Sequence, residues 1–189
     1  MVRVTYFVDG SSSDSTFYCR FGNQLTVGAV ISNDEVDCPS PATSQAERVM
    51  ISISTNAQQF SNDKEFIYYN HPNISTISPT SGPIGAGTLI DVRGASLEGA
   101  DTTTYRCQFG SSRRVEATYR TEPSRVLCYS PIGFGPSNRR FEISLNAQQY
   151  TTDAHHFNFY TPPHIDNLSP STGPVLGDTT VRLTGSGYA

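Results

Sequence analysis

Residues 105–110 read Tyr-Arg-Cys-Gln-Phe-Gly, so apolar Tyr105, Cys107 and Phe109 alternate with two polar residues before a glycine. Residues 17–22 read Phe-Tyr-Cys-Arg-Phe-Gly and repeat this alternation about 88 positions earlier. A period of two residues is typical of a β-strand with one buried face, and the glycine indicates a turn. Further alternating runs occur around 51–53, 115–119 and 141–145, and no segment shows a sustained helical period. We therefore predict an all-β fold.

Other segments return at nearly the same distance and define a unit of about 90 residues. Residues 54–60, Ser-Thr-Asn-Ala-Gln-Gln-Phe, return at 144–150 as Ser-Leu-Asn-Ala-Gln-Gln-Tyr. Residues 78–83, Ser-Pro-Thr-Ser-Gly-Pro, return at 169–174 as Ser-Pro-Ser-Thr-Gly-Pro. Several short strands in a unit of this size, without helices, predict a sandwich of two antiparallel sheets.

The repeat predicts three segments. We expect residues 71–161 to form a complete unit, 1–70 to lack the opening motif, and 162–189 to contain only that opening. Residues 181–184, Val-Arg-Leu-Thr, match residues 2–5, Val-Arg-Val-Thr, so the last segment carries what the first lacks. In the opening, Pro79 and Pro83 cannot donate to a strand ladder, which places it at a sheet edge or bend. Gly82 between them allows a positive φ.

The order of the motifs, Ser-Pro-x-x-Gly-Pro, then Cys-x-Phe-Gly, then Cys-x-Ser-Pro, resembles the IPT/TIG family. This is the immunoglobulin-like domain of plexins, of ectodomains of the hepatocyte-growth-factor-receptor type and of other large surface proteins. The resemblance implies tandem immunoglobulin-like sandwiches used for spacing and binding, and it implies no enzyme. The positions that fall on the family pattern in the middle unit are Ile74, Ile77, Ser78, Pro79, Gly82, Pro83, Gly87, Thr88, Gly94, Phe109, Gly110, Cys128 and Pro131.

The four cysteines allow three pairings. The repeat selects Cys19 with Cys38 and Cys107 with Cys128, because each unit then contains its own bond. Each bond closes a loop of about 20 residues and contributes ~3 kcal/mol in the chain-entropy model. Disulfides indicate an oxidising, extracellular compartment, whereas the alternative is four buried thiols in a cytosolic protein. A Cys-x-x-Cys element, which most zinc sites contain, is absent from the sequence.

Composition excludes several classes of protein. Only 16% of the 189 residues are charged, the net charge is −4 and Lys64 is the single lysine, which opposes nucleic-acid binding. The sequence has no nucleophile, phosphate-loop or paired-carboxylate motif, so we predict no catalytic residues. Residues 33–37, Asn-Asp-Glu-Val-Asp, are the densest acidic segment, but their spacing matches no calcium loop. We expect no metal and no cofactor, and N-glycans on the sequons at Asn73 and Asn167.

These patterns leave two hypotheses about function. The leading hypothesis is a non-enzymatic extracellular structural protein, in which TIG modules build a rod or a head-to-tail filament. The modules would be joined either as part of a longer covalent array or by exchange of the opening strands between copies. The alternative is a receptor or adhesin ectodomain that binds a protein or glycan ligand. It predicts an aromatic or arginine patch on one unit that the other lacks, and Phe134, Arg139 and Arg140 are the candidates.

Overall fold

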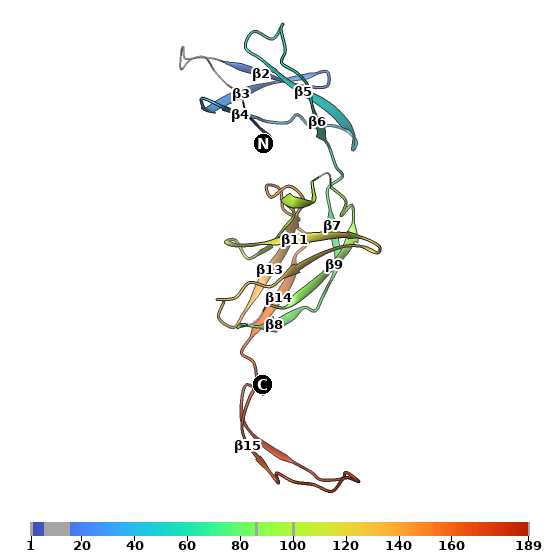
Figure 1. Ribbon diagram of the computed structural model, residues 1–189, viewed down its shortest axis with the longest axis vertical. Coiled ribbons are helices and arrows are strands. Elements are labelled where there is room, and N and C mark those ends of the chain that lie inside the picture. The colour runs from blue at the N-terminus through green and yellow to red at the C-terminus, as the bar shows by residue number, and fades with distance from the viewer. Residues whose placement is uncertain (1, 6–15, 86, 100, 189) are drawn as a thin grey trace. The chain divides into compact units, whose positions relative to one another are not determined.

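The computed structural model describes residues 2–5, 16–85, 87–99 and 101–188. The described residues form β-strands joined by turns and one 3₁₀ turn, η1 (Thr102–Thr104), which confirms the predicted all-β class. The described residues divide into two compact units (Figure 1): the first comprises residues 2–5, 16–71 and 98–99, and the second comprises residues 72–85, 87–97 and 101–188.

The first unit is one curled sheet in the order β1-β4-β3-β2-β5-β6. Strand β3 pairs with β2 through its first half and with β4 through its second half, so the sheet folds into two layers. The buried core between the layers contains Phe17, Cys19, Phe21, Val36, Cys38, Ile51 and Ile53. The strands are β1 (Val2–Thr5), β2 (Phe17–Phe21), β3 (Gln24–Ser32), β4 (Glu35–Cys38), β5 (Arg48–Ser54) and β6 (Lys64–Ile67).

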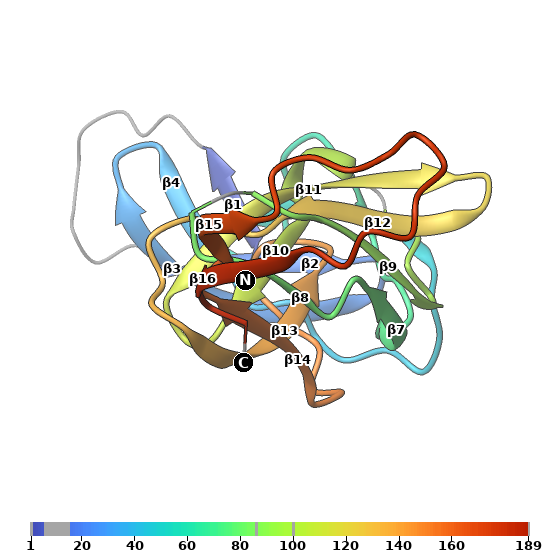
Figure 2. The same cartoon turned by 90° about the horizontal axis from the view of Figure 1, so that it is seen from below.

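The second unit repeats this order and adds two strands. Its sheet runs β7-β9-β12-β11-β10-β13-β14-β8, in which β9 to β14 follow the order of the first unit and β7 and β8 lie at the edges. The long strands β11 and β12 run side by side in Figure 2, and β11 again joins the two layers. The strands are β7 (Asn73–Ser78), β8 (Ser81–Pro83), β9 (Leu89–Ala95), β10 (Arg106–Phe109), β11 (Arg113–Thr121), β12 (Ser124–Tyr129), β13 (Ser137–Ser144) and β14 (His155–Tyr160).

A disulfide crosses the core of each unit between corresponding strands. Cys19 on β2 is bonded to Cys38 on β4, and Cys107 on β10 is bonded to Cys128 on β12, which are the pairs that the repeat selects. All four cysteines are buried. In the second unit, aromatic rings of one layer surround Phe109, whose ring lies 5.2 Å from Phe141 and 5.7 Å from Phe157 in edge-on contacts.

The opening motif lies at a sheet edge, as its prolines predict. Strand β8 pairs with β14 in parallel at one end of the sheet order, and the peptide bond between Ser78 and Pro79 is cis. Gly82 does not adopt the positive φ that a glycine allows. Gly82 is required by close packing instead: a Cβ there would overlap the Thr88 hydroxyl and lie 2.9 Å from the Phe157 ring.

A hairpin formed by β15 (His164–Ser169) and β16 (Arg182–Ser186) follows the second sandwich. Each of its paired positions lies 91 residues after a pair in β7 and β9, and the irregularity in the ladder recurs at the same point. The solvent exposure of the two hairpins differs. Ile74 and Ile77 on β7 are buried, whereas the corresponding Ile165 and Leu168 on β15 are about half exposed, at 50% and 49%.

We predict that Gly94→Ala strongly destabilises the second unit. A Cβ at Gly94 would overlap the carbonyl oxygen of Asn73 and approach the Ile74 Cα to 3.1 Å, which separates β7 from β9. We expect the free energy of unfolding of this unit to fall by about 3 kcal/mol, at the upper end for overpacking. Urea unfolding of the full chain measures the loss.

The matched control is Gly135→Ala, because no described neighbour lies within 4 Å of a Cβ at that position. Its free energy of unfolding should change by less than about 0.5 kcal/mol. Equal unfolding midpoints for the two variants would show that Gly94 is not needed for the β7–β9 pairing.

Candidate functional site

The clearest difference between the two units lies at one end of the second sandwich, where two arginines flank a phenylalanine. The guanidinium carbon of Arg139 lies 4.9 Å from the centre of the Phe134 ring, and that of Arg113 lies 5.8 Å from it. The Phe134 ring in turn packs on the buried Phe159 at 4.9 Å. We call Arg113, Phe134 and Arg139 the arginine–phenylalanine cluster.

Strand pairing explains why these residues meet. Phe109 pairs with Arg113 on one side and Phe141 on the other, so β11 and β13 both flank β10. Arg139 lies two residues before Phe141 and therefore projects from the same face of the sheet. Phe134 lies in the loop between β12 and β13 and covers the end of the core between these strands.

The first unit has different residues at all three positions. Gln24 pairs with Phe21 as Arg113 pairs with Phe109, and Val49 lies two residues before Ile51 as Arg139 lies before Phe141. Ser44 lies ninety positions before Phe134 in the repeat. The cluster therefore belongs to the second unit alone, which is the kind of asymmetry that the receptor hypothesis predicts.

The structure separates Arg140 from the other two predicted residues. Its Nε lies 2.7 Å from the Glu142 Oε1 on the opposite face of β13, because adjacent strand residues point in opposite directions. Glu142 also accepts a hydrogen bond from Gln108, and Gln108 accepts one from the Nε of Arg114. Arg140 thus belongs to a polar row across β11, β10 and β13. Arg113 was not among the residues predicted from the sequence, because its place depends on the hairpin register.

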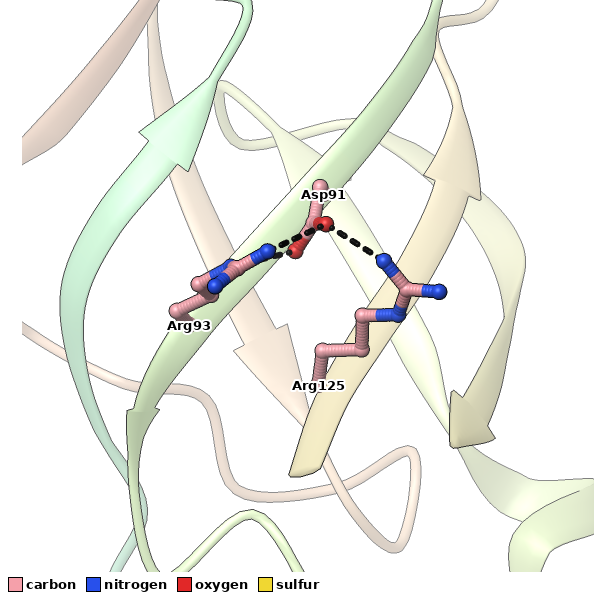
Figure 3. Close-up of polar contacts among 3 residues, drawn as sticks. All are labelled: Asp91, Arg93 and Arg125. Carbon is pink, nitrogen blue, oxygen red and sulfur yellow. Dashed lines mark hydrogen bonds and ion pairs between the residues drawn. The ribbon is translucent and has the colours of Figure 1, made fainter. Parts of the chain in front are cut away.

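A second group of arginines surrounds Asp91 on β9 (Figure 3). The Asp91 carboxylate accepts hydrogen bonds from the Nε of Arg93 at 3.3 Å and from the Nη1 of Arg125 at 3.0 Å. Burial by itself raises the pKa of this carboxyl, but the hydrogen bonds and charges of Arg93 and Arg125 outweigh burial and hold the pKa below its ordinary value of 3.8. The Asp91 carboxylate neutralises part of the positive charge of the two arginines. Its bond to Arg125 joins β9 to β12.

We predict that Asp91→Asn lowers the free energy of unfolding at pH 7 by about 1 kcal/mol, the upper range for partly exposed ion pairs. Because the folded pKa is depressed, the stabilisation is complete above the unfolded pKa of 3.8 and disappears as the pH falls through the lower, folded value. Unfolding curves between pH 7 and pH 2 should therefore converge for the two proteins.

The control for this experiment is Glu116→Gln, since Glu116 is exposed and has no ion-pair partner among the described residues. Its curve should follow the native one at every pH. A difference between Asp91→Asn and the native chain that persists unchanged at pH 2 would contradict the ion-pair explanation.

The repeated Asn-Ala-Gln-Gln segment forms a turn in both units. The Asn56 side-chain oxygen accepts from the backbone N–H groups of Gln58 and Gln59, and Asn146 makes the same two bonds to Gln148 and Gln149. Alanines at 57 and 147 both have positive φ, at 59° and 60°. Since its polar groups bond to each other, this motif shapes a loop and offers no ligand site.

The structure gives the sequons different surroundings. Asn73 is exposed on β7, and its amide nitrogen donates to Asp153 at 2.9 Å. Asn167 is exposed on β15, and its backbone carbonyl accepts from the Thr184 hydroxyl at 3.5 Å. Both side chains can be reached by solvent.

The acidic segment 33–37 spans the turn between β3 and β4, where the Asp34 N–H donates to the Ser32 hydroxyl. Within the described part of the chain, no three histidine, cysteine or acidic side chains come together as metal ligands would. The described residues also contain no helix with the length and hydropathy needed to cross a membrane.

Comparison with known proteins identifies the class of the second unit. Residues 72–159 match the IPT/TIG domain model, so this part of the chain has the sequence features of an IPT/TIG domain. The resemblance noted from the motifs is thereby confirmed.

Particular relatives are plexins and a fibrocystin. The chain is 22% identical to mouse plexin-B2 over 89% of its length, and 29% identical to mouse fibrocystin-L over 61% of its length. It spans only 8% and 2% of those two proteins. The structure of the full extracellular region of plexin A4, domains 1 to 10, aligns with a TM-score of 0.53 and 16% identity, covering 92% of this chain and 16% of that one. That likeness shows the fold, and none of these relatives supports a filament.

Proposed function

We propose that this chain is part of the extracellular region of a receptor or adhesin and that its second unit binds a protein or glycan ligand. The observation that carries the proposal is the arginine–phenylalanine cluster, present on the second unit and replaced by Gln24, Ser44 and Val49 in the first. Aromatic and arginine side chains dominate the energetics of protein interfaces. The plexin relatives and the two disulfides support an extracellular location.

The proposal includes the arrangement of the modules. Residues 1–70 are a TIG domain without its opening strands, 71–161 are a complete domain, and 162–189 are the opening of a further one. The matching registers of β7–β9 and β15–β16 support this division, since both hairpins begin with the same motif and have the same ladder irregularity. Tandem TIG modules in an extracellular region serve as spacers and binding units. The receptor hypothesis thus accounts for the repeat without a filament.

We predict that removal of the cluster strongly weakens attachment to cells that carry the ligand. The probe is the full chain fused to an antibody Fc dimer and titrated on a panel of animal cell lines by flow cytometry. Arg113→Ala with Arg139→Ala should weaken binding by about tenfold or more, as expected for a hot spot. Phe134→Ser, which installs the residue of the first unit, should also weaken binding.

Arg120→Ala is the matched control, because Arg120 is an exposed arginine of the same unit on the outward face of β11. It should bind as the native chain does. Thermal unfolding of each variant establishes that the fold is intact. Undiminished binding by the folded double variant would remove the cluster from the function.

We also propose that Asn73 and Asn167 carry N-glycans. In a chain secreted from mammalian cells, Asn73→Gln should remove one glycan, because the exposed Asn73 nitrogen retains one N–H for Asp153 after glycosylation. Mass spectrometry of glycopeptides before and after glycosidase treatment measures occupancy. An unmodified Asn73 peptide in the secreted protein would refute this site.

A further inference from the structure

The arginine–phenylalanine cluster is a place where positive charge has no internal counterpart. Neither Arg113 nor Arg139 has a carboxylate within 4.0 Å among the described residues, whereas Arg93, Arg125 and Arg140 each have one. Arg139 donates from its Nε to the Ser137 hydroxyl at 3.1 Å, which leaves its two terminal nitrogens for an external acceptor. The cluster therefore presents two unneutralised guanidinium groups.

The Phe134 ring orients these groups. A guanidinium over a ring face is held there by the ring quadrupole, and its edge still carries N–H donors that match the oxygens of a sulfate or carboxylate. Phe134 is itself fixed by packing on Phe159 at 4.9 Å. Two arginines on one fixed ring lose less conformational freedom on binding an anion than two free arginines would.

The geometry of the strands favours two anionic groups over one. Arg113 is on β11 and Arg139 is on β13, with β10 between them, so their backbones are separated by two strand spacings, or about 10 Å. Arg114 and Arg140 follow on the same strands and face the other side of the sheet, where Arg140 is paired with Glu142 and Arg114 donates to Gln108. An extended polyanion that crosses the cluster therefore meets two arginines, Arg113 and Arg139, from strands that lie two spacings apart.

The surroundings of the cluster suit a polysaccharide better than an acidic peptide. Phe134 is half-buried against the core, so its ring is already packed and does not offer a pocket for a large apolar anchor of a peptide. The neighbouring turn presents exposed Ser111 and Ser112, whose hydroxyls are able to donate to and accept from sugar hydroxyls. Binding here depends on charge and hydrogen bonds, which a sulfated chain supplies at regular intervals.

We propose that the cluster binds a sulfated polysaccharide, with Arg113 and Arg139 contacting two separate sulfate groups. This inference rests on the proposed function and names its ligand class. The site is restricted to the second unit because the first unit has Gln24 and Val49 at the positions of Arg113 and Arg139 in the shared strand register.

The test measures binding of the full chain to a defined heparin decasaccharide by calorimetry, at a series of NaCl concentrations from about 50 to about 300 mM, over which screening changes strongly. The native chain should bind, with affinity falling as salt rises. Arg113→Gln with Arg139→Gln should reduce the affinity at least tenfold at about 150 mM salt, the loss expected when two charge-assisted contacts are removed. Phe134→Ser keeps both charges and should reduce it about threefold, since the guanidinium groups lose their support.

A charge-matched variant, Arg93→Gln with Arg120→Gln, removes two positive charges elsewhere on the same unit. Its affinity should stay within about twofold of the native value, because screening makes distant charges weak. An equal loss in this variant would mean that heparin senses only net charge, and the proposed site would fall. No binding of heparin to the native chain would overturn it as well.

Two further outcomes separate this inference from the proposed function. If a poly-glutamate peptide binds as tightly as heparin and equally needs Arg113 and Arg139, the polysaccharide assignment is wrong. If the cell attachment of the Fc fusion needs both arginines but survives enzymatic removal of heparan and chondroitin sulfates, the receptor function stands and the sulfated ligand does not. If attachment is lost both in the double arginine variant and after enzymatic removal of the sulfated chains, the result supports the receptor function and the sulfated ligand together.

Discussion

Both units depend on one strand that pairs with different neighbours along its length. The first half of β3 pairs with β2 and its second half with β4, and β11 does the same with β10 and β12. A sheet that turns in this way faces itself, so alternate side chains are buried between two layers. The disulfides Cys19–Cys38 and Cys107–Cys128 connect the strands on either side of the turning strand. They therefore hold the layers together where the chain itself crosses between them.

Because the fold is fixed by inward-facing residues, the rim and the outer faces are free to differ between the units. Val49 packs against the core of the first unit, whereas in the second unit Phe134 packs on Phe159, with Arg113 and Arg139 near its ring. The outward positions of the turning strand differ as well: Leu25 and Val27 are exposed on β3, where β11 carries Arg114 and Glu116. The two units thus present different surfaces on sheets with the same strand order.

The sequence predicted the features that arise from local patterns. Alternation at Phe17, Cys19 and Phe21 indicated strands, and the repeat selected the cysteine pairs that the structure contains. Features that depend on packing between segments could not be predicted in the same way. Gly82 is needed for its closeness to Thr88 and not for its φ, and Arg113 reaches Phe134 only through the hairpin register. Arg139 and Arg140 face opposite sides of β13 because side chains alternate along a strand. The patch predicted from the sequence included both of these neighbours, and this alternation was not applied to them.

The central claim is that a common scaffold gains its binding function from three side chains at one end of the sandwich. Transplantation tests it most directly: Gln24→Arg, Ser44→Phe and Val49→Arg are introduced into a chain whose own cluster has been replaced by Gln, Ser and Val. The account predicts that attachment of the folded chain to ligand-bearing cells, lost with the original cluster, returns with the transplanted one. A folded, disulfide-bonded transplant that remains unable to attach would contradict it.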